Sequence, residues 1–213
     1  MDDFLIYSGY FVLLVNLILY TYSFFRKEKA NVFFIAYLAF LVVVQFSMEL
    51  MYHLHMNNLF AVNIFFIGQM ILLGLFFKSI LKIKSQKLFI NWSLLIMVLI
   101  LAIQCYIDSG QFLKFNLFAI TTTSLLSVVY ALLHFYNMLT DDKEYYYVTV
   151  GASSYLLVST VLFLVGNLTI GLSDELKLMT WNLNAFFVVA YQLFILYEWM
   201  VSFKTKKVIN TTV

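Results

Sequence analysis

Proline is absent from this sequence, and charged residues are scarce, at 11% of the chain. A soluble domain carries about 25% charged residues, so an ordinary soluble globular protein is excluded. Proline is a frequent cause of sharp kinks, and many transporters use broken helices, so its absence favours rather straight helices. The single cysteine, Cys105, cannot form a disulfide within one chain, and we interpret it as a small apolar core residue.

Residues that mark several known membrane functions are also missing. No lysine lies in the middle of the last apolar stretch, which argues against a retinal-binding opsin. That stretch has no histidine either, whereas seven-helix hydrolases of the ceramidase and progestin-receptor type use a His-x-x-x-His pair there. Neither a glycine-rich phosphate loop nor a ring of like residues typical of a channel is evident. We therefore predict no cofactor, no metal site and no nucleic-acid partner.

Seven apolar stretches make up most of the sequence, which is 63% hydrophobic. Each is about as long as the ~20 residues that a helix needs to cross a bilayer. Because the connections are short, we predict one all-α domain over residues 1–213, a polytopic seven-transmembrane-helix bundle. Asp2 and Asp3 stand where a signal peptide would carry basic residues, so we expect the first stretch to be retained. The expected spans are 4–24, 32–52, 58–80, 88–107, 113–138, 146–170 and 178–202.

Basic residues are distributed unequally between the two sides of this predicted bundle. Eleven of the 13 lysines and arginines fall in the first, third and fifth connections and the C-terminal tail. Only Lys114 and Lys177 lie on the other side. Cytoplasmic loops carry an excess of Lys and Arg, so we predict that the N-terminus is outside and the C-terminus is in the cytoplasm.

Gln45, Glu49 and His53 form the most informative polar row, because they lie four residues apart near the end of the second span. This spacing places them on one face of a helix. Ionisable residues within spans are costly and mark function by default. A carboxylate beside an imidazole suits a ligand site, a proton relay, an acid–base pair or two metal ligands. The alternative is a structural pair that satisfies itself at the membrane rim.

Further polar residues are expected at the same depth in other spans. If their helix faces converge with the row on the second span, they line an outward-opening pocket between helices. They are Tyr7, Tyr10, Asn63, Asn116, Asn167, Trp181 and Asn184.

Two polar faces extend toward the predicted cytoplasmic side. The fifth span carries Thr123, Ser127, Tyr130 and His134 at helical spacing. The seventh carries Asn184, Tyr191 and Glu198 at seven-residue spacing. Since His134 and Glu198 are expected at similar depth, they could form an inner polar lock. The alternatives are small hydroxyl residues that join helices and a carboxylate that snorkels toward the basic tail.

A faint internal repeat links the third and seventh spans. Gln69 and Gln192 each begin a run of apolar residues that leads to a basic exit. Both spans are expected to run in the same direction, so a 3+1+3 arrangement of helices is possible.

Three short motifs resemble those of a group of uncharacterised small bacterial seven-helix membrane proteins. They are Asn57-Asn58-Leu59, the run from Gly151 to Tyr155 with Gly166-Asn167, and Trp181-Asn182-Leu183-Asn184. The resemblance implies seven helices and a bacterial inner-membrane location. It implies no activity and transfers no functional residues.

Three functions remain open. The first is a receptor-like module with membrane lipids and a cytoplasmic or membrane protein as partners; it would bind a small apolar or amphipathic ligand in an outward pocket. Its predicted ligand-binding residues are Gln45, Glu49, His53, Asn63, Gln69, Asn184 and Tyr191. The second is a lipid-modifying enzyme in which Glu49 and His53 act as base and acid. The third is a 3+1+3 transporter of small solutes.

Overall fold

The computed structural model describes residues 2–26, 28, 30–140, 143–168 and 174–204. Within these residues the fold is all-α, with seven long helices and no strand. The helices are α1 (Asp2–Phe25), α2 (Val32–His53), α3 (Leu59–Ile80), α4 (Lys84–Ile107), α5 (Leu117–Asn137), α6 (Tyr146–Leu168) and α7 (Asp174–Trp199). A short 3-10 helix, η1 (Ser109–Leu113), precedes α5, and a π-helical turn, η2 (Met200–Lys204), follows α7.

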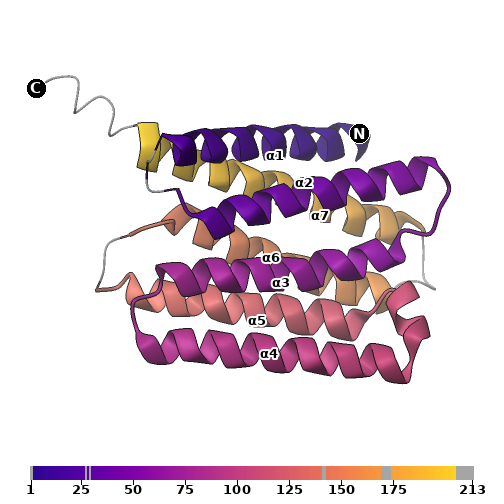
Figure 1. The fold of residues 1–213 in the computed structure, drawn as a ribbon. Coiled ribbons are helices and arrows are strands. Elements are labelled where there is room, and N and C mark those ends of the chain that lie inside the picture. The colour runs from indigo at the N-terminus through magenta and orange to yellow at the C-terminus, as the bar shows by residue number, and fades with distance from the viewer. Residues whose placement is uncertain (1, 27, 29, 141–142, 169–173, 205–213) are drawn as a thin grey trace, which may run out of the picture.

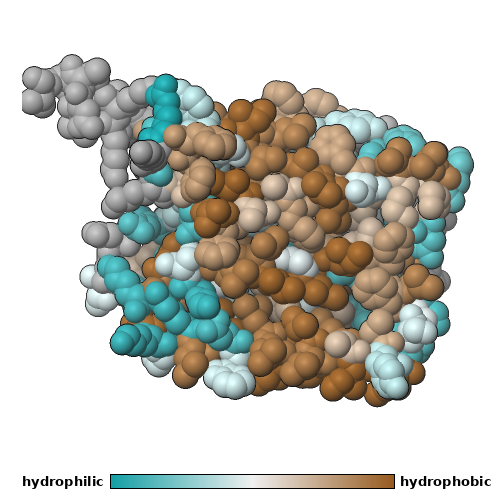
Figure 2. Space-filling model, in the orientation of Figure 1, coloured by the Kyte–Doolittle hydropathy of each residue, from teal (hydrophilic) through white to brown (hydrophobic). Residues whose placement is uncertain are grey.

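All seven helices are long and apolar enough to cross a membrane. They run alternately up and down the bundle, so α1, α3, α5 and α7 begin at one end, which we call the entry end (Figure 1). Hydrophobic side chains form a broad band across the visible face, and hydrophilic residues gather at both ends (Figure 2). These features suggest an integral membrane protein.

Six of the seven helices form a ring, and α4 lies outside it. Neighbours around the ring are α1, α2, α3, α5, α6 and α7, and α7 closes it against α1. Helix α4 packs on α3 and α5 from outside (Figure 1). The chain therefore forms two three-helix halves, α1–α3 and α5–α7. Helix α4 connects them, so that both halves begin at the entry end. These contacts agree with a 3+1+3 arrangement, which stays a prediction.

Side-chain caps determine where two of the helices begin. The Asn31 side chain accepts hydrogen bonds from the backbone N–H groups of Phe33 and Phe34 and so starts α2. The Asn116 side chain accepts from the Ala119 N–H, which explains why α5 starts at Leu117 and not at the expected residue 113. Helix α4 begins four residues before the expected span, at Lys84.

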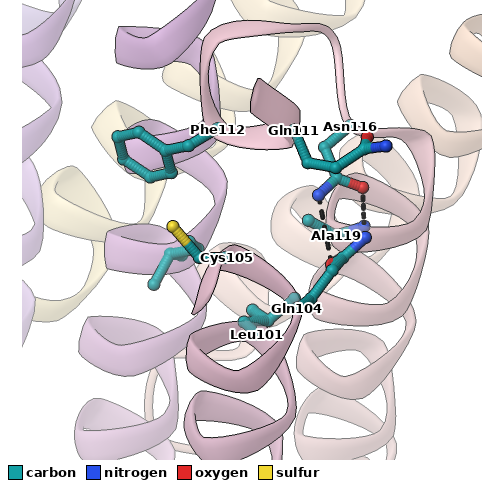
Figure 3. Close-up of a pocket in the computed structure, with 8 residues that line it drawn as sticks. Leu101, Gln104, Cys105, Gln111, Phe112, Asn116 and Ala119 are labelled. Atoms are coloured by element: carbon teal, nitrogen blue, oxygen red, sulfur yellow. Dashed lines mark hydrogen bonds between the residues drawn. The ribbon is translucent and has the colours of Figure 1, made fainter. Parts of the chain in front are cut away.

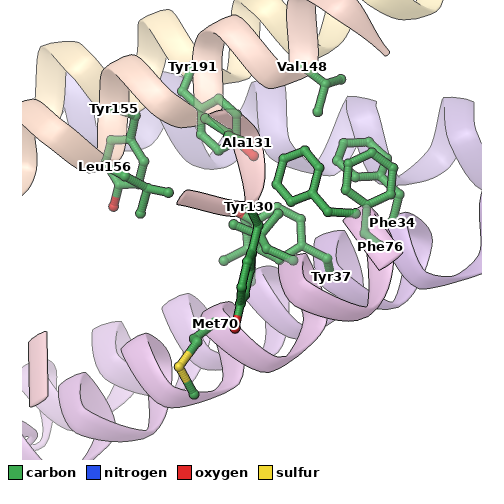
Figure 4. Packing of buried hydrophobic residues seen from close by; sticks show 14 of the residues in the cluster. Phe34, Tyr37, Met70, Phe76, Tyr130, Ala131, Val148, Tyr155, Leu156 and Tyr191 are labelled. Carbon is green, nitrogen blue, oxygen red and sulfur yellow. The ribbon is translucent and has the colours of Figure 1, made fainter. Parts of the chain in front are cut away.

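Aromatic side chains fill the core between the helices (Figure 4). Phe34 of α2 lies 5.0 Å from Phe76 of α3, measured between ring centroids, and Tyr37 is fully buried beside them. Glycine lets α6 and α7 approach closely at one position. A Cβ added at Gly151 of α6 would lie 2.8 Å from the Cβ of Phe194 on α7. The α6–α7 contact therefore depends on a glycine at this position.

Candidate functional site

The clearest polar cluster outside the core lies at the entry end, between α1 and α2. We call it the Glu49 cluster, and its members are Tyr7, Tyr10, Glu49 and His53. The Tyr10 hydroxyl donates to Oε2 of Glu49 over 3.2 Å, and the Tyr7 hydroxyl donates to Oε1 over 3.4 Å. His53 Nε2 lies 3.1 Å from the same Oε1. Helix geometry aligns Glu49 and His53, as expected, and α1 supplies the two phenols.

This cluster is only partly covered by protein. The side chain of Glu49 is 26% exposed and that of His53 is 62% exposed. Tyr10 packs on Phe46 with ring centroids 5.9 Å apart, and it meets Tyr7 edge to face at 6.3 Å. The carboxylate is therefore lined by aromatic rings on one side and accessible on the other.

Gln45 lies one helical turn before Glu49 on the same side of α2. Its side-chain oxygen Oε1 is buried and has no hydrogen-bond partner. A buried acceptor without a donor is unfavourable by about 1–3 kcal/mol, so a donor that reached this atom would stabilise it.

Asn63 and Asn184, which the sequence places at similar depth, lie at other positions around the ring. Asn63 on α3 is buried and donates to the backbone carbonyls of Phe112 and Lys114, so it holds the connection between α4 and α5. Asn184 on α7 accepts a hydrogen bond from Ser159 of α6 over 2.8 Å. The polar residues of the entry end therefore form separate contacts between neighbouring helices. Of the remaining residues predicted there, Asn167 has a side chain outside the described part of the chain.

A second polar group lies in the centre of the ring, where the two halves meet. Gln69 of α3 donates to the Tyr37 hydroxyl of α2 over 3.1 Å. Tyr191 of α7 stacks on Tyr155 of α6, with centroids 5.4 Å apart and planes within 5°. Gln69 Oε1 is buried and meets no hydrogen-bond partner, and the buried Tyr191 hydroxyl interacts with that of Tyr37.

His134 and Glu198 make separate contacts with α6 at the end opposite to the entry end. His134 Nδ1 lies 2.9 Å from the Thr149 hydroxyl, which itself donates to the Tyr145 carbonyl. The histidine therefore donates to the hydroxyl through Nδ1–H. Glu198 accepts the backbone N–H of Tyr147 over 2.8 Å and the Ser202 hydroxyl over 2.6 Å. In place of the expected direct contact, both residues fasten the first turns of α6.

At the same end of the bundle, a hydrogen bond also holds Tyr145 in the loop before α6. Tyr145 precedes α6 with a positive φ of 54°, and its hydroxyl accepts the backbone N–H of Asn31 over 2.8 Å. Burial raises the pKa of the Tyr145 phenol, so it stays protonated at neutral pH.

A row of contacts between α1 and α7 was not predicted from the sequence. The Asn16 amide donates to both the backbone carbonyl and the side-chain Oε1 of Gln192. Nearer the opposite end the Tyr20 hydroxyl donates to the Ile195 carbonyl over 3.2 Å. At the end of α7, Trp199 Nε1 donates to the Ser23 hydroxyl over 2.9 Å. A polar residue in the middle of an apolar span, Asn16, is the feature of the sequence that could have predicted these contacts.

One small pocket lies between α4, η1 and α5 at the entry end (Figure 3). Cys105 and Phe112 line one side of it, and Gln104, Gln111 and Asn116 line the other. Asn116 donates to Oε1 of Gln104 over 3.2 Å. At about 20 Å³ the pocket has room for about one water molecule, so it does not hold an amphipathic ligand.

Within the described part of the chain, no group of three or more His, Cys, Asp or Glu side chains is arranged to hold a metal ion. Comparisons with protein-family models, with curated proteins and with solved structures gave no match to this chain. The resemblance to small bacterial seven-helix proteins therefore stays a prediction, and function has to be argued from the geometry.

Proposed function

We propose that this protein is a receptor-like seven-helix membrane module that binds a small apolar or amphipathic ligand at the Glu49 cluster. The observation that carries the proposal is the convergence of two helices on one accessible carboxylate. Tyr7 and Tyr10 approach Glu49 from α1, and His53 approaches it from α2. All three contacts are between side chains, so a ligand can replace them without breaking backbone hydrogen bonds.

The surroundings of the cluster suit an amphipathic molecule. Large apolar side chains next to it are exposed, with Phe11 on α1 at 68% and Leu50 on α2 at 61%. An apolar tail can lie along these side chains, while the polar end reaches Glu49 and His53. Since lipid tails already cover such side chains in a bilayer, the tail contributes packing and the polar end supplies the specificity.

The contacts between α1 and α7 supply a physical connection from this site to the opposite end of the bundle. Helix α1 contributes Tyr7 and Tyr10 to the cluster and also bonds to α7 through Asn16, Tyr20 and Ser23. A ligand that moves α1 relative to α2 therefore also moves α7. The end of α7 carries Glu198, which caps α6, so we propose that η2 transmits the signal to a cytoplasmic or membrane protein partner.

Orientation and location are part of this proposal. The excess of basic residues at the end opposite to the entry end supports an N-terminus outside and a C-terminus in the cytoplasm. Lys82, Lys84 and Lys87 lie at the connection between α3 and α4, where hydrophilic residues gather in Figure 2. Of the other basic residues, Lys27, Lys29, Lys206 and Lys207 lie outside the described residues. We propose a bacterial inner membrane as the location, from the sequence resemblance alone.

Hydrogen exchange tests the proposal with the full chain in a neutral detergent. The probe is the total polar lipid extracted from the membranes in which the protein was produced. We expect the lipid to slow exchange of the backbone amides at the start of α1 and to change exchange at 196–204. Glu49→Ala is expected to abolish both changes, and Glu144→Ala, an exposed carboxylate at the other end, is expected to preserve them. Equal responses of wild type and Glu49→Ala would contradict the proposal.

A second candidate is a transporter of small solutes, favoured by the 3+1+3 helix order of the ring. Secondary transporters place their sites near the bilayer midplane, where two repeats meet. Gln69 and Tyr191 lie at mid-length of α3 and of the last span, one in each half, and Gln69 keeps a buried oxygen without a hydrogen-bond partner. Flux of a solute across sealed proteoliposomes, lost in Gln69→Leu, would identify this function. Product formed from added lipid, lost in Glu49→Gln, would instead identify the enzyme that uses Glu49 and His53.

A further inference from the structure

The charge of Glu49 has no permanent cation beside it. Within the described residues its only salt-bridge partner is His53, which is charged only when protonated. Its other partners, Tyr7 and Tyr10, are neutral hydrogen-bond donors. An accessible carboxylate in a membrane-spanning helix therefore favours a ligand that brings a positive charge.

The rings around Glu49 favour the same kind of ligand. Tyr7, Tyr10 and Phe46 form a continuous series of contacts next to the carboxylate. The face of an aromatic ring attracts an organic cation, and the attraction is stronger where water is excluded. Aromatic rings beside a carboxylate are the surroundings in which ammonium groups bind.

Gln45 distinguishes between two types of ammonium group. Its Oε1 is a buried acceptor without a donor, one turn from Glu49 on the same side of α2. A primary ammonium has three N–H donors, so when it binds Glu49 it can also donate to Gln45 once that side chain turns toward the surface, whereas a quaternary ammonium has no N–H group. The unpartnered acceptor therefore favours a primary ammonium.

We infer that the ligand of the Glu49 cluster is a membrane lipid with a zwitterionic headgroup that carries a primary ammonium, as in phosphatidylethanolamine. The ammonium binds between Glu49 and Gln45, the phosphate faces the exposed imidazole of His53, and the acyl chains lie along the apolar side chains of α1 and α2. This inference rests on the proposed function and names the ligand class of the same site.

Native mass spectrometry of the full chain in a nonionic detergent tests the inference with three added lipids. Phosphatidylethanolamine carries the primary ammonium, phosphatidylcholine replaces it with a quaternary one, and phosphatidylglycerol has no cation. A hydrogen bond to a charged group contributes enough to expect about tenfold tighter binding of phosphatidylethanolamine than of either other lipid. Glu49→Gln is expected to remove this preference, and Glu144→Gln, which changes the same charge at the other end, is expected to retain it.

Gln45→Leu provides a second variant, which keeps the test decisive if Glu49→Gln does not fold. It is expected to weaken binding of phosphatidylethanolamine several-fold and to leave phosphatidylcholine unchanged, because only the primary ammonium uses the Gln45 acceptor. The same titration with dodecylamine distinguishes a lipid headgroup from a free amine, and tight binding of dodecylamine alone would overturn the lipid assignment.

The remaining outcomes separate this inference from the proposed function. Equal binding of phosphatidylethanolamine and phosphatidylglycerol, still dependent on Glu49, would overturn the ammonium inference and leave the proposed site intact. Lipid binding that neither Glu49→Gln nor Tyr10→Ala changes would overturn both.

Discussion

Glu198 and Glu49 are both carboxylates within apolar helices, and the structure places them in opposite situations. Glu198 is 3% exposed and accepts hydrogen bonds from the Tyr147 backbone N–H and the Ser202 hydroxyl. Glu49 has a side chain that is 26% exposed, and all its partners are side chains. One carboxylate completes the start of a neighbouring helix, whereas the other is held by groups that a ligand can replace.

This difference shows what an ionisable residue in a span can mean. A helix N-terminus leaves backbone N–H groups without partners and carries a partial positive charge, so a carboxylate from a neighbouring helix stabilises it. Glu198 meets that need of α6 and is therefore expected to act on folding. Glu49 meets no backbone group and is therefore expected to act on binding.

The largest effect on stability is expected from Glu198→Ala. The change leaves the Tyr147 N–H and the Ser202 hydroxyl without this acceptor in a partly buried environment, which is expected to lower the free energy of unfolding by about 2–4 kcal/mol. Thermal and denaturant unfolding in a mild detergent measure this loss. Glu144→Ala is the matched control, because that carboxylate is exposed at the same end of the bundle and is expected to change stability by less than about 0.5 kcal/mol. Similar losses in both variants would contradict the capping role.

A substitution of glycine tests whether α6 and α7 pack more tightly than α1 and its neighbours. Gly151→Ala introduces a methyl group 2.8 Å from the Phe194 Cβ and 2.9 Å from the Tyr191 ring, so we expect a loss of about 1–3 kcal/mol. Gly9→Ala on α1 is the control, because its added Cβ would meet Val189 at 3.6 Å, an ordinary contact. The same unfolding measurement compares the two variants, and a harmless Gly151→Ala would show that the α6–α7 contact adapts.

The sequence predicted the number of helices and most of their ends, because length and hydropathy determine whether a helix can span a membrane. It also aligned Glu49 with His53, since both lie on one helix and the 3.6-residue period determines their relative direction. It did not predict which helices meet. Rotation about each helix axis is decided by packing between helices, and for this reason Asn63 and Asn184 lie apart from Glu49 while His134 bonds to Thr149.

The hydrogen bonds between α1 and α7 connect the Glu49 cluster to the end of the bundle that carries Glu198, and each can be removed separately. Asn16→Ala removes the amide that donates to Gln192, and hydrogen bonds between membrane helices contribute about 0.6–1.7 kcal/mol, so a loss of about 1 kcal/mol is expected. Asn58→Ala is the control, because Asn58 precedes α3 without a side-chain capping bond. If α1 transmits ligand binding to α7, Asn16→Ala also reduces the change in hydrogen exchange at 196–204 on lipid addition. An unchanged response would show that the two ends are coupled by another route.

The smallest effect on stability is expected from Glu49→Gln. The amide keeps the shape of the side chain and can still accept from Tyr10, and pairs of exposed charged groups contribute about 0–1 kcal/mol, so we expect a change below about 0.5 kcal/mol. Glu198→Gln makes the same chemical change at the buried site, where an amide is a weaker acceptor for the Tyr147 N–H than a carboxylate. Unfolding of these two variants side by side therefore compares the sites with the chemistry held constant. A loss at Glu49 as large as that at Glu198 would mean that the Glu49 cluster holds α1 to α2 and that a ligand cannot replace its contacts without destabilising the fold.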